Sequence, residues 1–216
     1  MTYNSLAVFA SMMSLAAAAN AQDISSHFVN LDFDSGVTMT GAFGFNGFDN
    51  PNYDIAGWNN HLGISDAGVQ GPEAWWGPYQ DKGAWINPGG SAFNLSDYTI
   101  QAGDTFSLSF VAQWWQWTGG NGQWTATLFY DNPANVIGSF VSPDLNPHTQ
   151  WTTYTSGPIA ATAASVGGHL GLLMSSTGSG IAQMDEITVS VPEPTTISLA
   201  ALAGLGMLLK RRQFIK

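Results

Sequence analysis

The segment Thr105-Phe106-Ser107-Leu108-Ser109-Phe110 alternates apolar residues with small polar ones. Alternation with a period of two indicates a half-buried β-strand, because successive side chains point to opposite faces of a sheet. Continued to residue 114, the alternation predicts these core-facing side chains: Phe106, Leu108, Phe110, Ala112 and Trp114. Trp115 and Trp117 then fall on the opposite face of the same segment.

Seven further runs, rich in Thr, Val and aromatic residues, bring the expected number of strands to eight. They lie at 27–33, 36–43, 123–130, 136–141, 151–158, 169–175 and 183–191. Gly-rich turn sequences such as Gly119-Gly120-Asn121-Gly122 separate them at the spacing of antiparallel strands. Segment 44–90 is dense in Gly, Pro, Asn and aromatic residues and is expected to form long loops with one or two short strands. We predict an all-β antiparallel β-sandwich of the jelly-roll type, with an immunoglobulin-like sandwich as the alternative.

The N-terminus has the pattern of a secretory signal peptide. An apolar run from Leu6 to Ala19 leads into Ala19-Asn20-Ala21, whose small residues flank one variable position as signal peptidase requires. Residues 1–5 carry no Lys or Arg, which departs from the usual positive start. We predict a signal peptide at residues 1–21, and therefore export.

The C-terminus combines three elements in order: Val191-Pro192-Glu193-Pro194, an apolar stretch at 195–209, and a basic tail at 210–216 that includes Lys210, Arg211 and Arg212. The apolar stretch is shorter than the roughly 20 residues of a comfortable membrane-spanning helix. The basic tail is expected to stay in the cytoplasm, which leaves everything upstream outside.

This order resembles the PEP-CTERM sorting signal of Gram-negative bacteria. The resemblance implies recognition by an exosortase, temporary insertion of a short transmembrane helix in the inner membrane, and a place at the cell surface or in the exopolysaccharide matrix of a biofilm. The mature domain is then residues 22–190, and the sorting signal is residues 191–216.

The mature domain is strongly acidic, with Lys82 against fourteen Asp and Glu residues between Gln22 and Val191. Nucleic acid and anionic lipid are poor partners for such a surface, because phosphate binding requires clustered Lys and Arg. The chain has no cysteine, so disulfides and thiol chemistry are excluded. Cations and neutral sugars remain as ligands.

Two segments resemble galactose-binding-like jelly rolls, a group that includes many carbohydrate-binding modules. Asn30-Leu31-Asp32-Phe33-Asp34-Ser35-Gly36 is similar to their Asn-x-x-Phe-Glu-x-Gly opening, and Met184-Asp185-Glu186-Ile187-Thr188-Val189 to their closing strand. The resemblance implies that Asp34 and Asp185 share a structural calcium ion, although Asp stands at position 34 where that pattern has Glu. Carboxylate oxygens are the ligands that calcium prefers.

Aromatic residues suggest a binding surface for a sugar chain, because indole rings stack on the apolar faces of sugar rings. We predict that Trp75, Trp76, Tyr79, Trp115 and Trp117 contact such a ligand, and the alternative is that these rings fill a core.

The sequence has no evident paired-carboxylate motif and no Gly-x-Ser-x-Gly elbow, although the members of a Ser-His-Asp triad converge only in space. We predict no enzymatic activity. Asp97, Asp104, Asp131 and Asp144 are expected at turns, and the four histidines are scattered. The predicted function is the binding of a neutral glycan or exopolysaccharide outside the cell. A purely structural matrix protein is the first alternative. The second, a calcium-dependent hydrolase or cyclase, predicts a carboxylate of raised pKa.

Overall fold

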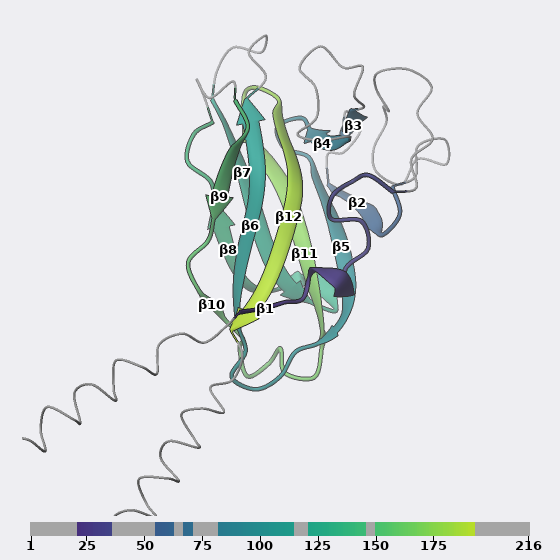
Figure 1. Cartoon of the computed structure of the whole chain (residues 1–216), viewed down its shortest axis with the longest axis vertical. Coiled ribbons are helices and arrows are strands. Elements are labelled where there is room, and N and C mark those ends of the chain that lie inside the picture. The colour runs from purple at the N-terminus through teal and green to yellow at the C-terminus, as the bar shows by residue number, and fades with distance from the viewer. Residues whose placement is uncertain are drawn as a thin grey trace, which may run out of the picture. The chain divides into compact units, whose positions relative to one another are not determined.

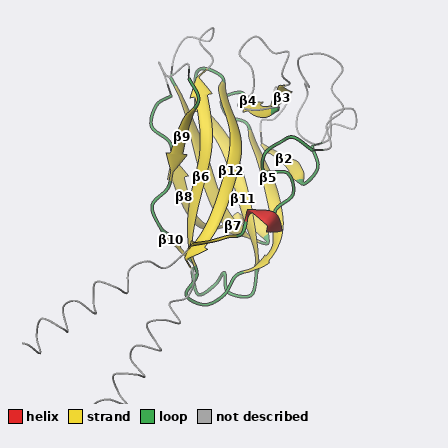
Figure 2. Cartoon of the chain, in the orientation of Figure 1, coloured by secondary structure: helices red, strands yellow, loops and turns green. Residues whose placement is uncertain are grey.

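The computed structural model describes residues 21–35, 55–62, 67–70, 82–114, 121–145 and 150–192. Residues Asp23–Val191 form one compact unit. Within the described residues the chain is built almost entirely from antiparallel strands, and one short 3-10 helix, η2 (Ser25–His27), follows the first strand (Figures 1 and 2).

Two antiparallel sheets make the sandwich, with β6 and β12 of one sheet in front of β7 and β11 of the other in Figure 1. The seven-stranded sheet contains β1 (Ala21–Asp23), β3 (Ala67–Gln70), β4 (Gly83–Ile86), β6 (Thr105–Trp114), β9 (Thr152–Thr155), β10 (Ile159–Ala160) and β12 (Ala182–Pro192). The five-stranded sheet has the order β2-β5-β11-β7-β8 and contains β2 (Trp58–Leu62), β5 (Ser91–Thr99), β7 (Gly122–Tyr130), β8 (Asn132–Val141) and β11 (His169–Gly178). The predicted jelly-roll sandwich is confirmed.

The core lies between the inward faces of the two sheets. All five side chains predicted to face it from β6 are buried, four of them completely: Phe106, Leu108, Phe110, Ala112 and Trp114. The opposite sheet contributes the alternate residues of β7 and β11, which are also completely buried: Trp124, Ala126, Leu128, Leu170, Leu172 and Met174. Removing these aromatic and aliphatic surfaces from water supplies the main force that holds the sheets together.

The predicted strand at 27–33 is wrong. The structure has a 3-10 turn and an irregular loop there, in which Asn30 and Phe33 adopt positive φ angles of 60° and 58°. That left-handed conformation cannot continue a strand. The apolar alternation is nevertheless meaningful, because Phe28, Leu31 and Phe33 are all buried. They anchor the loop to the core without joining a sheet, and the predicted strand at 36–43 lies outside the described residues.

The other predicted strands fall within β6, β7, β8, β9, β11 and β12, although β9 is shorter than the predicted 151–158. Strand β5 was not predicted. Its inward face carries Asn94 and Ser96, whereas its outward face carries Phe93 and Leu95. The buried donors on this face have partners: the Asn94 amide donates to the Val29 carbonyl at 2.7 Å and the Ser96 hydroxyl to the Leu170 carbonyl at 2.6 Å.

Candidate functional site

The predicted sugar-binding residues Trp75, Trp76, Tyr79, Trp115 and Trp117 lie outside the described residues, so their role stays a prediction. Four of the five described tryptophans are buried: Trp58, Trp85, Trp114 and Trp124. Trp151 is half-buried. Among the described tryptophans, packing into the interior is therefore the rule.

The loop 30–35 presents two carboxylates beside the last strand. The Asn30 side chain closes this loop, accepting from the Ser35 backbone N–H at 2.8 Å and donating to the Ser35 carbonyl at 2.9 Å. Phe33 stacks on Trp58 with ring centroids 5.1 Å apart, and the Trp58 indole donates to the Asn30 carbonyl at 2.9 Å. The loop is thereby fixed with Asp32 exposed and Asp34 half-buried.

Lys82 is held against Asp34 by two hydrogen bonds. Its ammonium donates to the Asp34 carbonyl at 2.6 Å, and its backbone N–H donates to the Asp34 carboxylate at 3.0 Å. Lys82 is the only Lys or Arg between Gln22 and Val191. The one permanently positive side chain of the mature domain is therefore engaged in this contact.

Asp185 and Glu186 complete a group of four carboxylates. They sit at a register shift in the pairing of β12 with β6, where Glu186 has a φ of 49°. Asp185 is only 1% exposed, and burial followed by the nearby charges of Glu186, Asp34 and Asp32 raises its pKa to about 8, despite a hydrogen bond from the Glu186 N–H. Burial and the charges of Asp32 and Asp34 also raise the pKa of Glu186.

These carboxylates offer the hard oxygen atoms that calcium prefers, and their mutual repulsion is the cost that a bound cation would remove. Asp34 and Asp185, the predicted calcium pair, thus belong to one electrostatic group. In the described part of the chain, no three His, Asp or Glu side chains converge closely enough to hold a metal ion in the present arrangement. Calcium binding accordingly stays a prediction.

The outward side of β12 is buried next to this group. Gln183 is fully buried and Gln113 is 4% exposed, and the Gln113 amide donates to the Gln183 side-chain oxygen at 2.5 Å. Trp85 of β4 pairs with Gln183 in register and is also buried. Sequence reasoning did not find this row, because glutamine on an alternating strand normally indicates a solvated face.

The outward face of the five-stranded sheet is a second region that the sequence analysis did not identify. Three cross-strand rows cover it: Asn59–Phe93–Leu173–Thr127–Ser139, Leu95–Gly171–Phe129–Val136, and Ser91–Ser175–Thr125–Val141. We call these rows the outer platform. They contain no Asp, Glu, Lys or Arg.

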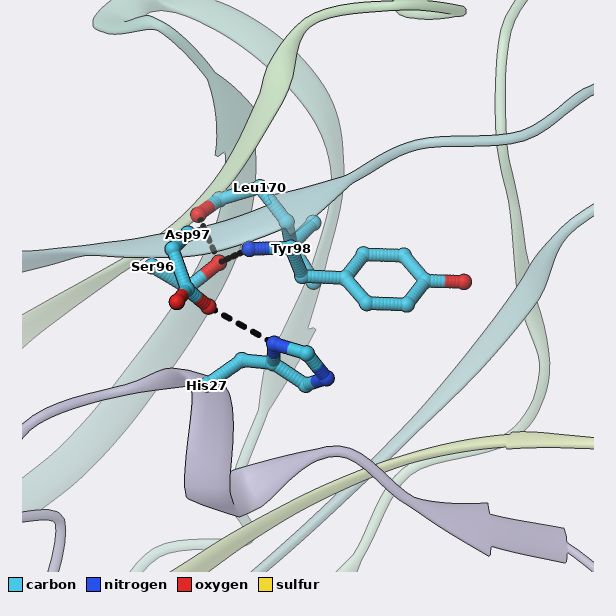
Figure 3. Close-up of polar contacts among 5 residues, drawn as sticks. All are labelled: His27, Ser96, Asp97, Tyr98 and Leu170. Atoms are coloured by element: carbon cyan, nitrogen blue, oxygen red, sulfur yellow. Dashed lines mark hydrogen bonds and ion pairs between the residues drawn. The ribbon is translucent and has the colours of Figure 1, made fainter.

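The histidine and carboxylate predictions need one correction. Asp97 lies within β5 and not at a turn, and its carboxylate contacts the His27 ring at 2.6 Å (Figure 3). Asp104 does lie at a turn, where its carboxylate accepts from the Tyr98 hydroxyl at 2.9 Å and from the Gln101 N–H. Burial and this carboxylate raise the pKa of Tyr98 to about 12. Each pair connects two segments of the chain. The neighbouring Ser96 hydroxyl accepts from the Tyr98 N–H and donates to the Leu170 carbonyl.

Of the predicted sorting residues, Val191 is buried near the end of β12, and Pro192 is the last residue of that strand. Glu193, Pro194, Arg211 and Arg212 lie outside the described residues. No helix in the described ranges is long and apolar enough to cross a membrane.

No protein-family model and no curated protein matches the chain. A cyclase from Fischerella sp. TAU superposes with a TM-score of 0.58 at 16% identity, over 81% of this chain and 100% of the cyclase. The Stig cyclase Fisc from the same organism, in complex with (3Z)-3-(1-methyl-2-pyrrolidinylidene)-3H-indole, gives 0.57 at 16% identity, over 80% and 98%. The carbohydrate-binding module TmCBM61, in complex with β-1,4-galactotriose, gives 0.47 at 11% identity, over 76% and 96%. The two cyclases share the fold of this chain. At these identities the likeness reaches no further than the fold.

Proposed function

We propose that this protein is an exported jelly roll that binds a neutral polysaccharide outside the cell without transforming it. One observation carries the proposal: the mature domain has a single lysine against fourteen carboxylates, and the ammonium of that lysine is hydrogen-bonded to the Asp34 carbonyl. Phosphate-bearing polymers and acidic polysaccharides meet a surface that repels them. A neutral sugar chain meets no such barrier.

Export and sorting complete the proposal. The signal peptide at 1–21 and the PEP-CTERM-like signal at 191–216 direct the domain through an exosortase to the envelope or the extracellular matrix of a Gram-negative bacterium. The inner membrane holds the short apolar helix before processing. The abundant neutral polymer in those places is exopolysaccharide, which makes the location and the proposed ligand consistent with each other.

Calcium is the proposed structural ion. Asp34 and Asp185 would hold it, and Asp32 and Glu186 supply negative charge nearby. By neutralising the carboxylates of both segments, the ion would hold the loop 30–35 against β12. We expect calcium to raise the melting temperature of the full-length protein, and Asp34→Asn to abolish the rise. Asp97→Asn is the matched control, because that carboxylate lies on β5 with its side chain 82% exposed and pairs with His27.

The binding proposal is tested by retention of the purified full-length protein on insoluble xylan, mannan, galactan and cellulose, each in calcium and in a chelator. Alginate, a polyanion, is the comparison ligand. Retention on at least one neutral polymer together with none on alginate in chelator supports the proposal. If the protein binds none of the neutral polymers in calcium, the proposal is contradicted and the structural matrix protein is favoured. The burial of four of the described tryptophans fits that alternative.

A second candidate function is acid catalysis at Asp185. A carboxyl group with a pKa of about 8 is protonated at neutral pH, which is the form that a general acid requires. The two roles of Asp185 exclude each other, because a calcium ligand must be ionised. A calcium-induced rise in melting temperature that Asp185→Asn removes would therefore count against the catalytic role.

A further inference from the structure

We propose that the outer platform of the five-stranded sheet is the polysaccharide-binding surface, and that the sugar chain lies across the strands. This inference rests on the proposed function and assigns its site. It places the ligand on β2, β5, β11, β7 and β8, away from the tryptophans that the sequence suggested.

Half of the prominently exposed large apolar side chains of the described residues lie on this face. Six large apolar side chains in the described ranges are prominently exposed, and three of them belong to the outer platform: Leu95 at 42%, Val136 at 53% and Val141 at 51%. Each comes from β5 or β8, at opposite sides of the sheet. The solvated face of an antiparallel sheet is ordinarily polar, so an apolar face of this kind indicates a surface that binds something.

A buried aromatic ring forms the floor beneath the platform. The ring of Phe129 covers Gly171, where any side chain would collide with it, and Phe93 meets Phe129 edge to face with centroids 6.0 Å apart. Glycine at position 171 thus lets an aromatic ring lie down on the neighbouring strand. Phe129 is itself fully buried, so it supports Phe93 from below and does not contact a ligand. The half-buried side chains of Phe93 and Leu173 and the exposed Leu95 present the apolar surface on which the faces of sugar rings can pack.

Hydroxyl and amide groups border this floor. The exposed Ser139 shares a hydrogen bond at 2.8 Å with the buried Thr127 hydroxyl, and Asn59 is exposed at the other end of the same row. Ser175 and Thr125 are half-buried in the next row. Strands are spaced about 4.8 Å apart, so the five-strand row is roughly 19 Å long. A mixed apolar and hydroxyl strip of that length suits several linked sugar rings, which also alternate C–H surface with hydroxyls.

Charge decides which occupant the platform takes. A second copy of the chain would also bring a net charge near −13 from its mature domain, and two such domains repel each other. An anionic polymer is repelled in the same way. The three rows contribute no charge of their own, so a neutral polyol is the ligand whose desolvation and approach cost least.

The test introduces a carboxylate onto the platform at exposed positions, where folding is least affected. Leu95→Asp and Val136→Asp are compared with Val166→Asp, which makes the same change at a side chain exposed by 44% outside the platform. Full-length proteins are titrated against the neutral polysaccharide that retains the wild type, and melting temperatures confirm that each variant is folded. We expect at least a tenfold weaker affinity for the two platform variants and less than a twofold change for the control.

Equal binding by platform variants and wild type overturns the site while leaving the proposed function intact. An equal loss in Val166→Asp also overturns it, because general acidity then explains the result. If the wild type retains no neutral polysaccharide, the proposed function and the site fall together.

Discussion

The two outward faces of the sandwich are built in opposite ways. On the seven-stranded sheet, the outward residues Gln113, Gln183 and Asp185 are polar or acidic and yet buried. On the five-stranded sheet, the outward residues Leu95, Val136 and Val141 are apolar and yet exposed. The first face has its polar groups committed to internal hydrogen bonds and the carboxylate group, whereas the second keeps apolar surface available. The difference is consistent with a stabilising role for one face and with the ligand binding that we propose for the other.

The largest effect expected from this comparison is a pH dependence of the free energy of unfolding that comes from Asp185 on the seven-stranded sheet. In chelator, folded Asp185 keeps its proton up to about pH 8, whereas the unfolded chain releases it above about pH 4. The unfolded state then binds fewer protons between these values, so the free energy of unfolding falls as pH rises, by on the order of 5 kcal/mol at most. Urea denaturation between pH 4.5 and 8 measures it.

Calcium should flatten this profile, because it favours the ionised carboxylate. Asp185→Asn should flatten it without calcium, while Asp97→Asn on the five-stranded sheet should leave the slope in place. If the free energy of unfolding of the wild type in chelator does not change with pH, the assignment of the carboxylate group is contradicted.

A smaller effect is expected from the buried amides. Gln183→Ala removes the group that accepts from the Gln113 amide and leaves a cavity at a fully buried position. We expect a loss of about 2 to 3 kcal/mol in the free energy of unfolding. Gln123→Ala on the opposite sheet is the matched control, since this half-buried amide donates to the Ser142 carbonyl at 3.2 Å, and its loss should cost less than about 1 kcal/mol. An equal loss in the free energy of unfolding for the two substitutions would contradict the proposed difference between the two faces.

The floor of the outer platform predicts the smallest of these effects. A methyl group at position 171 collides with the Phe129 ring, whereas one at Gly157 meets no atom within 4 Å. We expect Gly171→Ala to cost about 1 to 2 kcal/mol by displacing a packed ring and Gly157→Ala to be close to neutral. Thermal unfolding of both variants measures the difference. An unchanged Gly171→Ala protein would mean that the Phe129 ring is not held over the glycine.

The parts of the fold that follow simple periodicity were predictable from the sequence. Strand β6 has apolar residues on one face and small polar residues on the other, and its five core residues were identified correctly. The alternation at 27–33 was misread because left-handed φ angles at Asn30 and Phe33 depend on the hydrogen bonds of the Asn30 side chain, which a pattern of apolar residues does not report.

Strand β5 escaped prediction because its alternation is inverted. Its polar residues Asn94 and Ser96 face the interior, where carbonyl groups of Val29 and Leu170 accept their hydrogen bonds, and its large apolar residues Phe93 and Leu95 face outward. Only the folded arrangement supplies those carbonyl groups. The same inversion created the outer platform, so the feature that concealed the strand is the feature on which the binding proposal rests.

Hydroxyl-radical footprinting with a bound neutral oligosaccharide tests the central claim most directly, because it reports the accessibility of individual side chains across the whole chain. The account predicts slower oxidation of Phe93, Leu95 and Val136 when the sugar is bound. Protection confined to Trp75, Trp76, Trp115 and Trp117, with the platform oxidised as in the free protein, would contradict it and return the site to the loops that the sequence indicated.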